Sequence, residues 1–515
     1  MIAAPLFEQA RRRPEAPFII LDERTVSYGE MSDLAARFAD WAGRRGIAPG
    51  DRVALLSGNN VSFLAIWFGL AAMGAVLVPL NTALRGEGLR YILAQSGACL
   101  LLGEWAELAD KRDEIENHFP DLEIFAFADD ADLEQALPKV AELPSPAPAE
   151  PGSSCAIIYT SGTTGLPKGV VISHTAYLVA GDGIRRANEL TAADRIMVVL
   201  PLYHANAQMY AVMSSIQCGG AIVLRREFSA SRFFAEAKYF GATCFTYVGT
   251  VLGILAARYP EPQRDHSLTW CTGGGAAPAA VWDQIEERFG VAVRELYGMT
   301  ETGGFISLNS AADSRHHSCG RVRPDAQAQI VDDHDQPLPV GEVGEIVVRP
   351  SEPFVFFNGY HEAPEITLES YRNLWFHTGD RGRFDDDGYL YFEGRTKDLI
   401  RRAGQMISPS EIEVMLARHP AVADCAVVGL ADDIMGEEIK AAVVLEKGNG
   451  NGNGLAAEDL AAYLRQRLAA FLVPRYFEFV DRIPKTETHK VQRHRLQGRG
   501  DGVIDLLPGG QQNRD

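Results

Sequence analysis

The chain has 515 residues, of which 46% are hydrophobic and 23% charged, and its formal net charge is −19. These values are typical of a soluble globular protein with several structural units. The acidic balance argues against a nucleic-acid partner, because Lys and Arg are scattered and form no basic stripe. Seven widely spaced cysteines without a C-x-x-C pair argue against a zinc site or a disulfide framework and favour the cytoplasm.

Short apolar runs and helical periodicities alternate over the first 130 residues. We predict strands at residues 52–56, 75–80 and 98–102, and helices at residues 61–73 and 86–95. Such alternation is typical of a parallel sheet flanked by helices.

The uncharged run at residues 61–80 is long enough to be weighed as a membrane span. However, Gly69, Gly74 and Pro79 interrupt it, and its β-branched residues cluster only at its end. We therefore predict a buried helix followed by a buried strand, and no integral membrane segment.

The most informative segment is residues 159–170, which read YTSGTTGLPKGV between predicted strands at 155–159 and 170–172. It contains three glycines, four aliphatic hydroxyl side chains and one lysine. Glycines let backbone N–H groups turn toward an anion, and hydroxyls and a lysine can bind phosphate oxygens. The spacing differs from the Walker pattern, because Lys168 precedes Gly169 and not a Ser or Thr. A phosphate clamp is favoured over the alternative, an ordinary flexible turn.

A second series of strands is predicted at residues 195–200, 221–224, 243–248 and 268–272. From residue 326 to 391 the sequence becomes turn-rich, which indicates a small β unit. Beyond residue 397 helical and strand patterns alternate again, which predicts a compact α+β domain of about a hundred residues.

Four later segments place charged side chains next to turn residues. They are ELYGMTET at 295–302, HTGD at 377–380, FEGRTKD at 392–398 and PKTETHK at 484–490. Each alone has a structural explanation, such as a turn or an exposed lysine near the end of the chain. Their joint order behind the glycine-rich segment is specific.

With that segment, these motifs resemble the AMP-forming adenylate-forming superfamily, which includes acyl-CoA synthetases, firefly luciferase and peptide-synthetase adenylation domains. The resemblance covers essentially the whole chain. It implies an α/β fold with a large N-terminal adenylation domain (residues 1–397) of parallel-sheet α/β subdomains plus a small β unit. It also implies a small, mobile α+β C-terminal domain (residues 398–497). We expect the tail at residues 498–515 to be disordered.

The resemblance assigns nucleotide-binding roles position by position. It implies a phosphate loop for the β and γ phosphates of ATP, formed by Thr160, Ser161, Gly162, Thr163, Thr164 and Lys168. It implies an adenine site lined by Gly274, Ala276, Glu295, Tyr297, Gly298 and Met299. It implies that the ribose hydroxyls are bound by Asp380 and Arg395.

The implied catalytic residues suit the chemistry of acid activation. The carboxylate of the acid must attack the α-phosphorus and expel pyrophosphate, so negative charge accumulates on three groups. Thr300 would contact the α-phosphate, Glu301 would hold Mg²⁺, and Lys490 would reach the carboxylate and the α-phosphate. Rotation about a hinge at Asp398 would then withdraw Lys490 and admit a thiol.

The choice of acid is less constrained. Amino-acid-activating members have an aspartate where residues 201–208 read PLYHANAQ, with His204 and no acid. This resembles acyl-CoA and aryl-CoA ligases, and His204 is interpreted as a catalytic residue or, alternatively, as a buried core histidine. Local texture at residues 228–234, 319–322 and 332–339 looks most like the crotonobetaine/carnitine–CoA ligase branch.

Aromatic side chains leave the substrate class open. Tyr210, Tyr247 and Phe305 would suit a quaternary ammonium, a fatty acid or an aryl acid. The residue before Lys490 is His489, where the family usually has glycine, and it either tunes the approach of the lysine or fills space.

We therefore expect an ATP-dependent carboxylic acid–CoA ligase that uses ATP, Mg²⁺ and coenzyme A. It would form an acyl-adenylate and pyrophosphate, then an acyl-CoA and AMP, in fatty-acid or carnitine metabolism. The alternatives are transfer to a carrier-protein thiol, a luciferase-like oxygenase, and a binding protein with a decayed site. The expected partners are small molecules only, and the expected assembly is a cytoplasmic monomer or homodimer.

Overall fold

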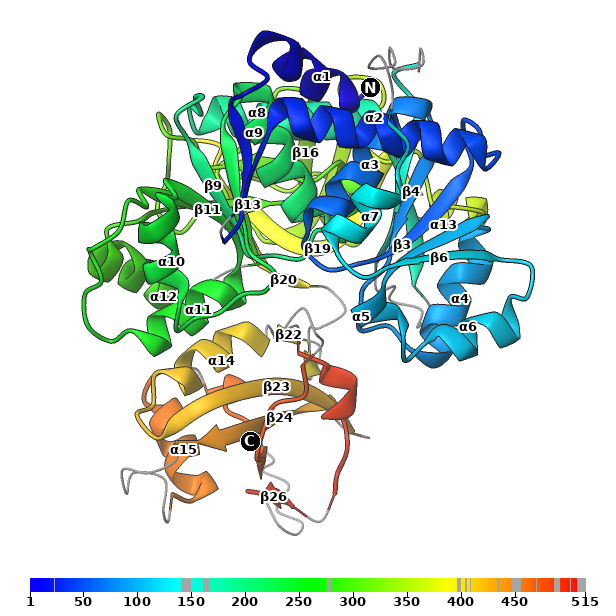
Figure 1. Cartoon of the computed structure of the whole chain (residues 1–515). Coiled ribbons are helices and arrows are strands. Elements are labelled where there is room, and N and C mark those ends of the chain that lie inside the picture. Colours follow the sequence, from blue (N-terminus) through cyan, green and yellow to red (C-terminus); the bar gives the residue numbers. More distant parts are fainter. Residues whose placement is uncertain are drawn as a thin grey trace. The chain divides into compact units, whose positions relative to one another are not determined.

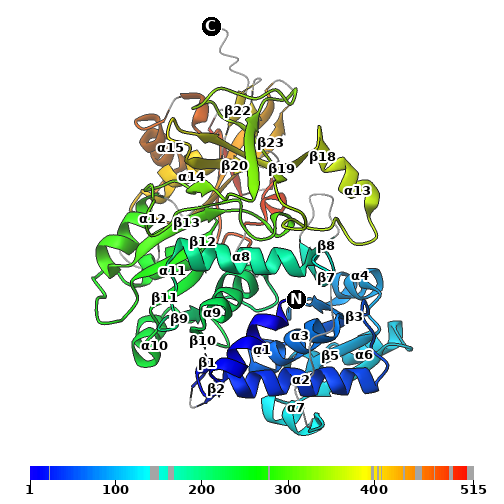
Figure 2. The same cartoon turned by 90° about the horizontal axis from the view of Figure 1, so that it is seen from above.

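The computed structural model describes the chain except residues 23, 140–149, 161–166, 276–278, 396–399, 403–404, 408, 433–434, 447–454, 469, 486–490, 501 and 507–515. It divides into two compact units. The first unit comprises Met1–Gln329, Val347–Thr378 and Phe384–Tyr391, and the second comprises Ile330–Ile346, Gly379–Arg383 and Phe392–Asp515. Figures 1 and 2 show mixed sheets and helices, as predicted for an α/β protein.

One sheet of the first unit has six strands in the order β6-β5-β3-β4-β7-β8. Its strands are β3 (Arg52–Leu56), β4 (Val76–Pro79), β5 (Leu100–Glu104), β6 (Glu123–Phe127), β7 (Ser154–Thr160) and β8 (Lys168–Ser173). All neighbours are parallel except β7 and β8, which form an antiparallel pair. The glycine-rich segment therefore connects the two antiparallel strands at the edge of this sheet.

Helix α3 (Val61–Met73) is the buried helix predicted from the uncharged run. The Asn60 side chain accepts the N–H of Phe63 at 2.8 Å and caps the start of α3, and Gly74 ends it in the left-handed conformation. Helix α3 packs side by side with α2 (Tyr28–Arg44) in both views (Figures 1 and 2). The contact needs Gly69, because a Cβ there would lie 2.7 Å from the Ala35 carbonyl oxygen. No helix in the described part of the chain is long and apolar enough to cross a membrane.

The other large sheet has nine strands in the order β15-β14-β13-β12-β11-β9-β10-β1-β2. Its strands are β1 (Pro17–Ile20), β2 (Thr25–Ser27), β9 (Arg195–Val198), β10 (Ala221–Leu224), β11 (Cys244–Val248), β12 (Trp270–Gly274), β13 (Ala292–Tyr297), β14 (Ser307–Leu308) and β15 (Arg321–Val322). Strands β1 and β9 to β13 are parallel where they pair. The carboxyl ends of β11, β12 and β13 therefore meet at one edge.

The remaining helices of the first unit connect and cover these sheets. They are α1 (Ala3–Arg12), α4 (Gly86–Ser96), α5 (Trp105–Leu108), α6 (Arg112–His118), α7 (Asp130–Ala136), α8 (His174–Ala187), the π-helix η1 (Asn206–Val212), α9 (Met213–Cys218), α10 (Phe233–Phe240), α11 (Gly249–Arg258), α12 (Ala279–Gln284), the π-helix η2 (Ile285–Phe289) and α13 (Pro364–Glu369). Helices α8 and α9 lie side by side in both views (Figures 1 and 2).

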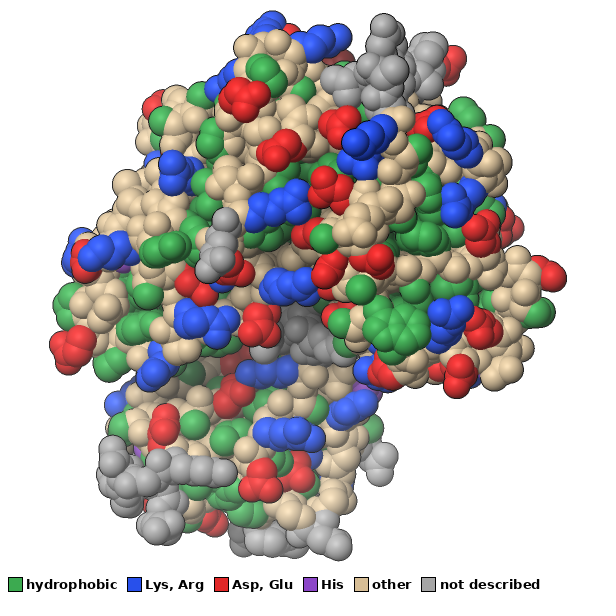
Figure 3. Space-filling view, in the orientation of Figure 1, with side chains coloured by type: hydrophobic (Ala, Val, Ile, Leu, Met, Phe, Trp, Pro, Cys, Tyr) green, Lys and Arg blue, Asp and Glu red, His purple; other side chains and the backbone are tan. Residues whose placement is uncertain are grey.

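The turn-rich segment forms the predicted small β sheet. Its order is β16-β17-β19-β18, with β20 on β19, and its strands are β16 (Ala326–Val331), β17 (Gly344–Pro350), β18 (Tyr371–Arg372), β19 (Trp375–Phe384) and β20 (Leu390–Arg395). On the face of the molecule drawn in Figure 3, Lys and Arg side chains are interspersed with Asp and Glu side chains.

The second unit contains the α+β domain expected beyond residue 397. Its sheet has the order β22-β21-β24-β25-β26, with β23 on β24. Its main elements are β21 (Ile400–Arg402), β22 (Gln405–Ile407), α14 (Pro409–Ala417), β23 (Val422–Asp432), β24 (Gly436–Leu445), α15 (Ala457–Arg465), β25 (Tyr476–Phe479) and β26 (Val503–Asp505). Apolar side chains of α14 and α15, such as Leu416 and Leu460, share one buried core with the sheet.

The expectation of a disordered tail from residue 498 was wrong for β26 (Val503–Asp505). This strand pairs antiparallel with β25. Arg475 Nε and Nη2 donate to Oδ1 and Oδ2 of Asp505, each at 2.9 Å. Backbone pairing and this bidentate ion pair hold the segment. Its short apolar run, which begins with Val503 and Ile504, was overlooked between polar and glycine-rich stretches.

Candidate active site

Three neighbouring strands bring site residues together at their carboxyl ends. Tyr247 of β11 is opposite Gly273 of β12, which in turn is opposite Glu295 of β13. Gly274 ends β12, and Tyr297 ends β13. In open α/β sheets, ligands bind outside the carboxyl ends of the strands. The predicted adenine residues that the structure describes therefore lie at the edge where a ligand is expected.

A buried hydrogen bond joins two of these strands. Tyr247 is fully buried and Glu295 is 4% exposed, and the Tyr247 hydroxyl donates to Glu295 Oε2. Burial and then the neighbouring carboxylate raise the pKa of Tyr247 well above its ordinary value. The Glu295 carbonyl oxygen accepts from the backbone N–H of Asn309 at 3.1 Å and from its side-chain amide at 3.2 Å. The Glu295 carboxylate and its backbone are thus both held in place.

Gly298 allows a tight turn after β13. A Cβ at this position would lie 2.3 Å from both the Gly304 carbonyl oxygen and Phe305 Cα. The turn contains a short 3₁₀ helix, Thr300–Thr302, and the Thr302 hydroxyl accepts the N–H of Met299 at 3.1 Å. Thr300 and Glu301, both predicted catalytic residues, therefore lie in a turn that the hydrogen bond between Met299 and Thr302 closes.

Tyr360 contacts both Glu301 and Lys168. The Tyr360 hydroxyl donates to Glu301 Oε1 at 3.1 Å, and Lys168 Nζ lies 5.1 Å from the centroid of the Tyr360 ring. Burial, followed by the Glu301 charge, raises the pKa of Tyr360. The tyrosine therefore remains a neutral donor to the carboxylate. Sequence reasoning missed Tyr360, because its local sequence does not distinguish it from an ordinary aromatic residue beside a turn.

Backbone hydrogen bonds fix the segment that carries Tyr360 against β8. Asn358 N–H donates to Val171 O at 2.8 Å, Val171 N–H donates to Gly359 O at 3.1 Å, and His361 N–H donates to Gly169 O at 2.7 Å. At its start, Phe357 N–H donates to Glu301 O at 3.0 Å. The segment thus connects the strand after the glycine-rich loop with the Glu301 turn.

His204 lies in the turn between β9 and η1. Its ring is half-buried and lies 4.7 Å from the Tyr203 ring, centroid to centroid. It immediately precedes the π-helix Asn206–Val212, and the Asn206 side chain donates to Tyr247 O at 3.1 Å. π-Helical turns are rare in proteins, but those that occur often lie at functional sites. The His204 segment and the Tyr247–Glu295 pair therefore belong to one region.

The other predicted site residues are placed less completely. Thr160 is paired with Lys168 across the β7–β8 register. Asp380 is 4% exposed in β19, and the neighbouring strand β20 ends at Arg395. The predicted residues Ser161, Gly162, Thr163, Thr164, Ala276, Asp398 and Lys490, and the side chain of Arg395, lie outside the described part of the structure.

A cavity of about 730 Å³ is lined mainly by residues of α8 and of the segment from Phe305 to Asp325. Its wall includes Phe305, which is 2% exposed, and Arg323, which is 7% exposed. Arg323 Nη2 donates to the carbonyl oxygens of Thr302 and Val355, both at 3.2 Å, and its Nε lies 3.4 Å from Asp325 Oδ2. Arg323 Nε and Nη1 are buried and make no hydrogen bond within the described residues. Burial lowers the pKa of Arg323, but the group remains a cation at neutral pH.

The chain matches a known enzyme family and several of its characterised members. The AMP-binding enzyme family matches residues 6–361, and the C-terminal domain of AMP-binding enzymes matches residues 411–490. A sulfoacetate–CoA ligase of Cupriavidus necator is 32% identical over 96% of this chain and 97% of that protein. A crotonobetaine/carnitine–CoA ligase of Escherichia coli is 34% identical over 92% and 93%.

Solved structures agree with the fold. ATP-bound MatB of Rhodopseudomonas palustris has a TM-score of 0.88 at 27% identity, covering 96% of this chain and 98% of that one. The o-succinylbenzoate CoA synthetase of Bacillus subtilis, in complex with its acyl-adenylate intermediate, has a TM-score of 0.85 at 27% identity over 97% and 99%. The fold is therefore that of adenylate-forming enzymes, with a large N-terminal and a small C-terminal domain.

Proposed function

The chain belongs to the AMP-binding enzyme family and is an ATP-dependent acid–CoA ligase, and we propose how its own residues share the reaction. In the first step a carboxylate oxygen of the acid attacks the α-phosphorus of ATP. The bond to the β-phosphate oxygen breaks, and pyrophosphate leaves with its electron pair. In the second step the sulfur of coenzyme A attacks the acyl carbon and the thiol proton is released to solvent. The bond from the acyl carbon to the phosphate oxygen breaks, and AMP leaves with that oxygen.

The observation that carries this assignment is the link between Lys168 and Glu301 through Tyr360. Lys168 and the hydroxyls of the preceding loop bind the β and γ phosphates. The Thr300 hydroxyl binds the α-phosphate beside them. Tyr360 is a positioning residue, since it orients the Glu301 carboxylate and offers its ring face to the Lys168 ammonium.

We assign Mg²⁺ to Glu301. The donor chemistry fits, because Mg²⁺ prefers oxygen ligands and is usually held by one or two carboxylates together with substrate phosphates. The ion, when bound, offsets the negative charge of the phosphates. The chain contributes a carboxylate whose orientation is fixed by Tyr360 and by the closed turn at Thr300–Thr302.

The adenosine part of ATP is assigned to the strand edge. Gly274, Ala276, Glu295, Tyr297, Gly298 and Met299 line the adenine, and Asp380 and Arg395 bind the ribose. The buried bond from Tyr247 to Glu295 keeps that wall rigid. We assign His204 to the side of this wall from which the acid approaches the α-phosphate.

We assign roles in the change from the first step to the second to Lys490 and Asp398. Lys490 neutralises the reacting carboxylate, and rotation about Asp398 moves it away before the thiol enters. This sets the proposed boundary between the domains at residues 397 and 398, with the C-terminal domain ending near residue 497. We place the enzyme in the cytoplasm, because the odd number of cysteines fits a reducing compartment.

The acid is proposed to carry a second anionic group, such as a carboxylate or a sulfonate, at its far end. Arg323 is the most deeply buried charged group in the cavity wall next to Phe305. Its Nε and Nη1 make no hydrogen bond among the described residues, although Nε lies 3.4 Å from Asp325 Oδ2. The Arg323 guanidinium lies 5.3 Å from the Phe305 ring centroid, and Tyr247 is bound to Glu295. These two aromatic groups are therefore poorly placed to cage a quaternary ammonium. The sulfoacetate–CoA ligase relative is named for an acid with such a second anion.

A panel of acids tests the function. Malonate, succinate, sulfoacetate, butyrate, benzoate and carnitine are each incubated with ATP and Mg²⁺, with and without coenzyme A, and AMP is quantified. We expect coenzyme A-dependent AMP with at least one acid, and the highest kcat/KM with a dianionic acid. Absence of AMP with every acid would overturn the assignment, and preference for carnitine or butyrate would overturn the proposed substrate class alone.

A further inference from the structure

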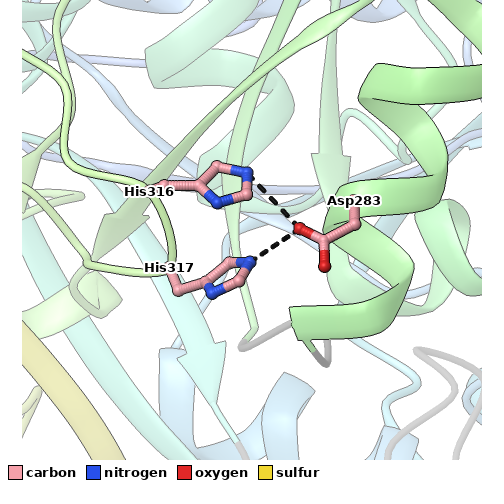
Figure 4. Close-up of side chains that lie close together, drawn as sticks. All are labelled: Asp283, His316 and His317. Atoms are coloured by element: carbon pink, nitrogen blue, oxygen red, sulfur yellow. Dashed lines mark hydrogen bonds and ion pairs between the residues drawn. The ribbon is translucent and has the colours of Figure 1, made fainter.

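A second cluster of potential ligands lies apart from the residues assigned to ATP and the acid. It consists of Asp283 on α12 and of His316 and His317, in the loop between β14 and β15, and the ligand atoms of all three lie within 4.8 Å of one another. His317 Nε2 is 2.8 Å and His316 Nε2 is 3.5 Å from the same oxygen, Asp283 Oδ1. Figure 4 shows both rings directed at this carboxylate.

The backbone at His317 explains how two consecutive histidines point the same way. Consecutive side chains of an extended segment point to opposite sides. His317 instead has a φ of 63°, in the left-handed region that is unfavourable for a residue with a Cβ. This brings the two ring centroids to 4.0 Å. An unfavourable conformation of this kind persists where the surrounding structure requires it and is frequent at functional sites.

Neighbouring groups hold the cluster in place. Glu286 Oε1 accepts from the Trp282 indole N–H at 3.0 Å and from the Val293 backbone N–H at 2.9 Å, while its Oε2 lies 3.1 Å from His316 Nε2. The buried Trp282 ring also lies edge-on to both imidazoles. A second, fixed carboxylate therefore stands at the edge of the cluster, next to two orientated imidazoles.

The donor set and its spacing match a transition metal. Bonds of about 2.0–2.1 Å in tetrahedral geometry put ligand atoms roughly 3.4 Å apart, and the two observed nitrogen-to-oxygen distances, 2.8 and 3.5 Å, lie on either side of that value. Imidazole nitrogens suit Zn²⁺, Ni²⁺ and Cu²⁺, whereas Mg²⁺ prefers an all-oxygen shell. Both histidines are exposed, so a cation can enter from solvent and retain water.

We propose that Asp283, His316 and His317 bind one divalent transition-metal cation of the Zn²⁺ class, with the Glu286 carboxylate at the edge of its coordination shell. The ion would join α12, which follows the proposed adenine residues Gly274 and Ala276, to the loop between β14 and β15. It would thereby stabilise this side of the nucleotide site. None of its ligands is a residue assigned to Mg²⁺, so the two cations act at separate places.

Zinc binding to the full chain, prepared without an affinity tag and stripped with a chelator, tests the proposal. Isothermal titration with Zn²⁺ in the presence of excess Mg²⁺ is expected to show one site per chain. His316→Ala and His317→Ala should each weaken binding at least tenfold. His334→Ala, which removes another exposed histidine from an acidic turn, is the matched control and should leave binding unchanged.

A spectroscopic readout separates loss of the site from loss of folding. Co²⁺ in place of Zn²⁺ is expected to give a visible d–d absorption band in the parent protein, which Asp283→Asn, nearly the same in shape, should abolish while the thermal unfolding temperature without metal stays unchanged. Equal zinc affinity in the parent and in the His316→Ala/His317→Ala double variant would overturn the proposal. Absence of a zinc site in the parent protein would overturn it as well and would identify the cluster as histidines hydrogen-bonded to carboxylates.

Discussion

The Tyr360 hydroxyl donates a hydrogen bond of 3.1 Å to Glu301 Oε1, and the two residues are 59 positions apart in the chain. Lys168 Nζ lies over the aromatic ring of the same tyrosine, 5.1 Å from the ring centroid. One side chain therefore orients the proposed magnesium ligand and contacts the lysine of the phosphate loop. This arrangement couples the two groups that must act on the same triphosphate.

Tyr360→Phe is expected to slow adenylation without unfolding the protein. A hydrogen bond to a charged group contributes about 1.5–3 kcal/mol, so the rate of ATP–pyrophosphate exchange should fall roughly 10- to 100-fold. The loss should be larger at low Mg²⁺, because the Glu301 carboxylate is then less well oriented. Tyr371→Phe is the control, since Tyr371 packs on Phe357 nearby. Exchange at the parental rate across all Mg²⁺ concentrations would show that Tyr360 does not position Glu301.

Gly298→Ala is expected to abolish most activity. The added Cβ would lie 2.3 Å from the Gly304 carbonyl oxygen, so the turn that carries Thr300 and Glu301 must open. A displacement of about 1 Å in a catalytic group can cost roughly a hundredfold in rate. Gly253→Ala in helix α11 is the matched control, because nothing lies within 4 Å of its Cβ position. AMP formation by both variants at a similar rate would contradict the role of the closed turn.

Arg323→Gln is expected to change selectivity among acids. The variant keeps hydrogen-bonding capacity but loses the positive charge, so KM for a dianionic acid should rise roughly 10-fold or more, given about 1.5–3 kcal/mol for a hydrogen bond to a charged group. KM for a monoanionic acid should rise much less. Arg186→Gln removes a mostly exposed arginine from the same cavity wall and serves as control. Equal losses for both classes of acid would assign Arg323 to the support of the Thr302 and Val355 carbonyls only.

Stability is expected to fall in mild acid through His174. Burial, and then the positively charged N-terminus, lower the pKa of His174 to about 4, and its Nδ1 accepts from Ile2 N–H at 3.3 Å. At a pH below the ordinary histidine pKa of about 6.5, His174 takes up a proton in the unfolded chain but not in the folded chain. The free energy of unfolding therefore falls, by an amount of order 2–3 kcal/mol, as the pH falls from about 6.5 to 4. Urea unfolding at pH 7 and pH 5 measures it. His174→Asn, which retains an acceptor, should show a weaker pH dependence; an unchanged dependence would contradict the assignment.

Local pattern predicted many elements well. The helix at residues 61–73 is confirmed at both ends, because Asn60 is a strong local start signal and Gly74 a strong local stop signal. The strand at residues 221–224 is confirmed as β10. The strand predicted at residues 98–102 is shifted to Leu100–Glu104, since an apolar run marks a strand but not its register in the sheet.

Contacts between distant segments were beyond reach of such patterns. Tyr360 received no role from the sequence, because only the folding of residues 357–361 against β8 brings it to Glu301. Arg323 reads as an ordinary surface cation, yet its side chain is 5% exposed. In the same way, His316 and His317 meet Asp283 only because of the left-handed backbone at His317.

The most direct test of activation through an acyl-adenylate follows one oxygen atom of the acid. The best acid of the panel is prepared with ¹⁸O in its carboxylate and incubated with the enzyme, ATP, Mg²⁺ and coenzyme A, and the AMP is analysed by mass spectrometry. If the acid carboxylate attacks the α-phosphorus, each AMP carries one ¹⁸O from the acid. AMP without the label, or ADP in place of AMP, would contradict activation through an acyl-adenylate.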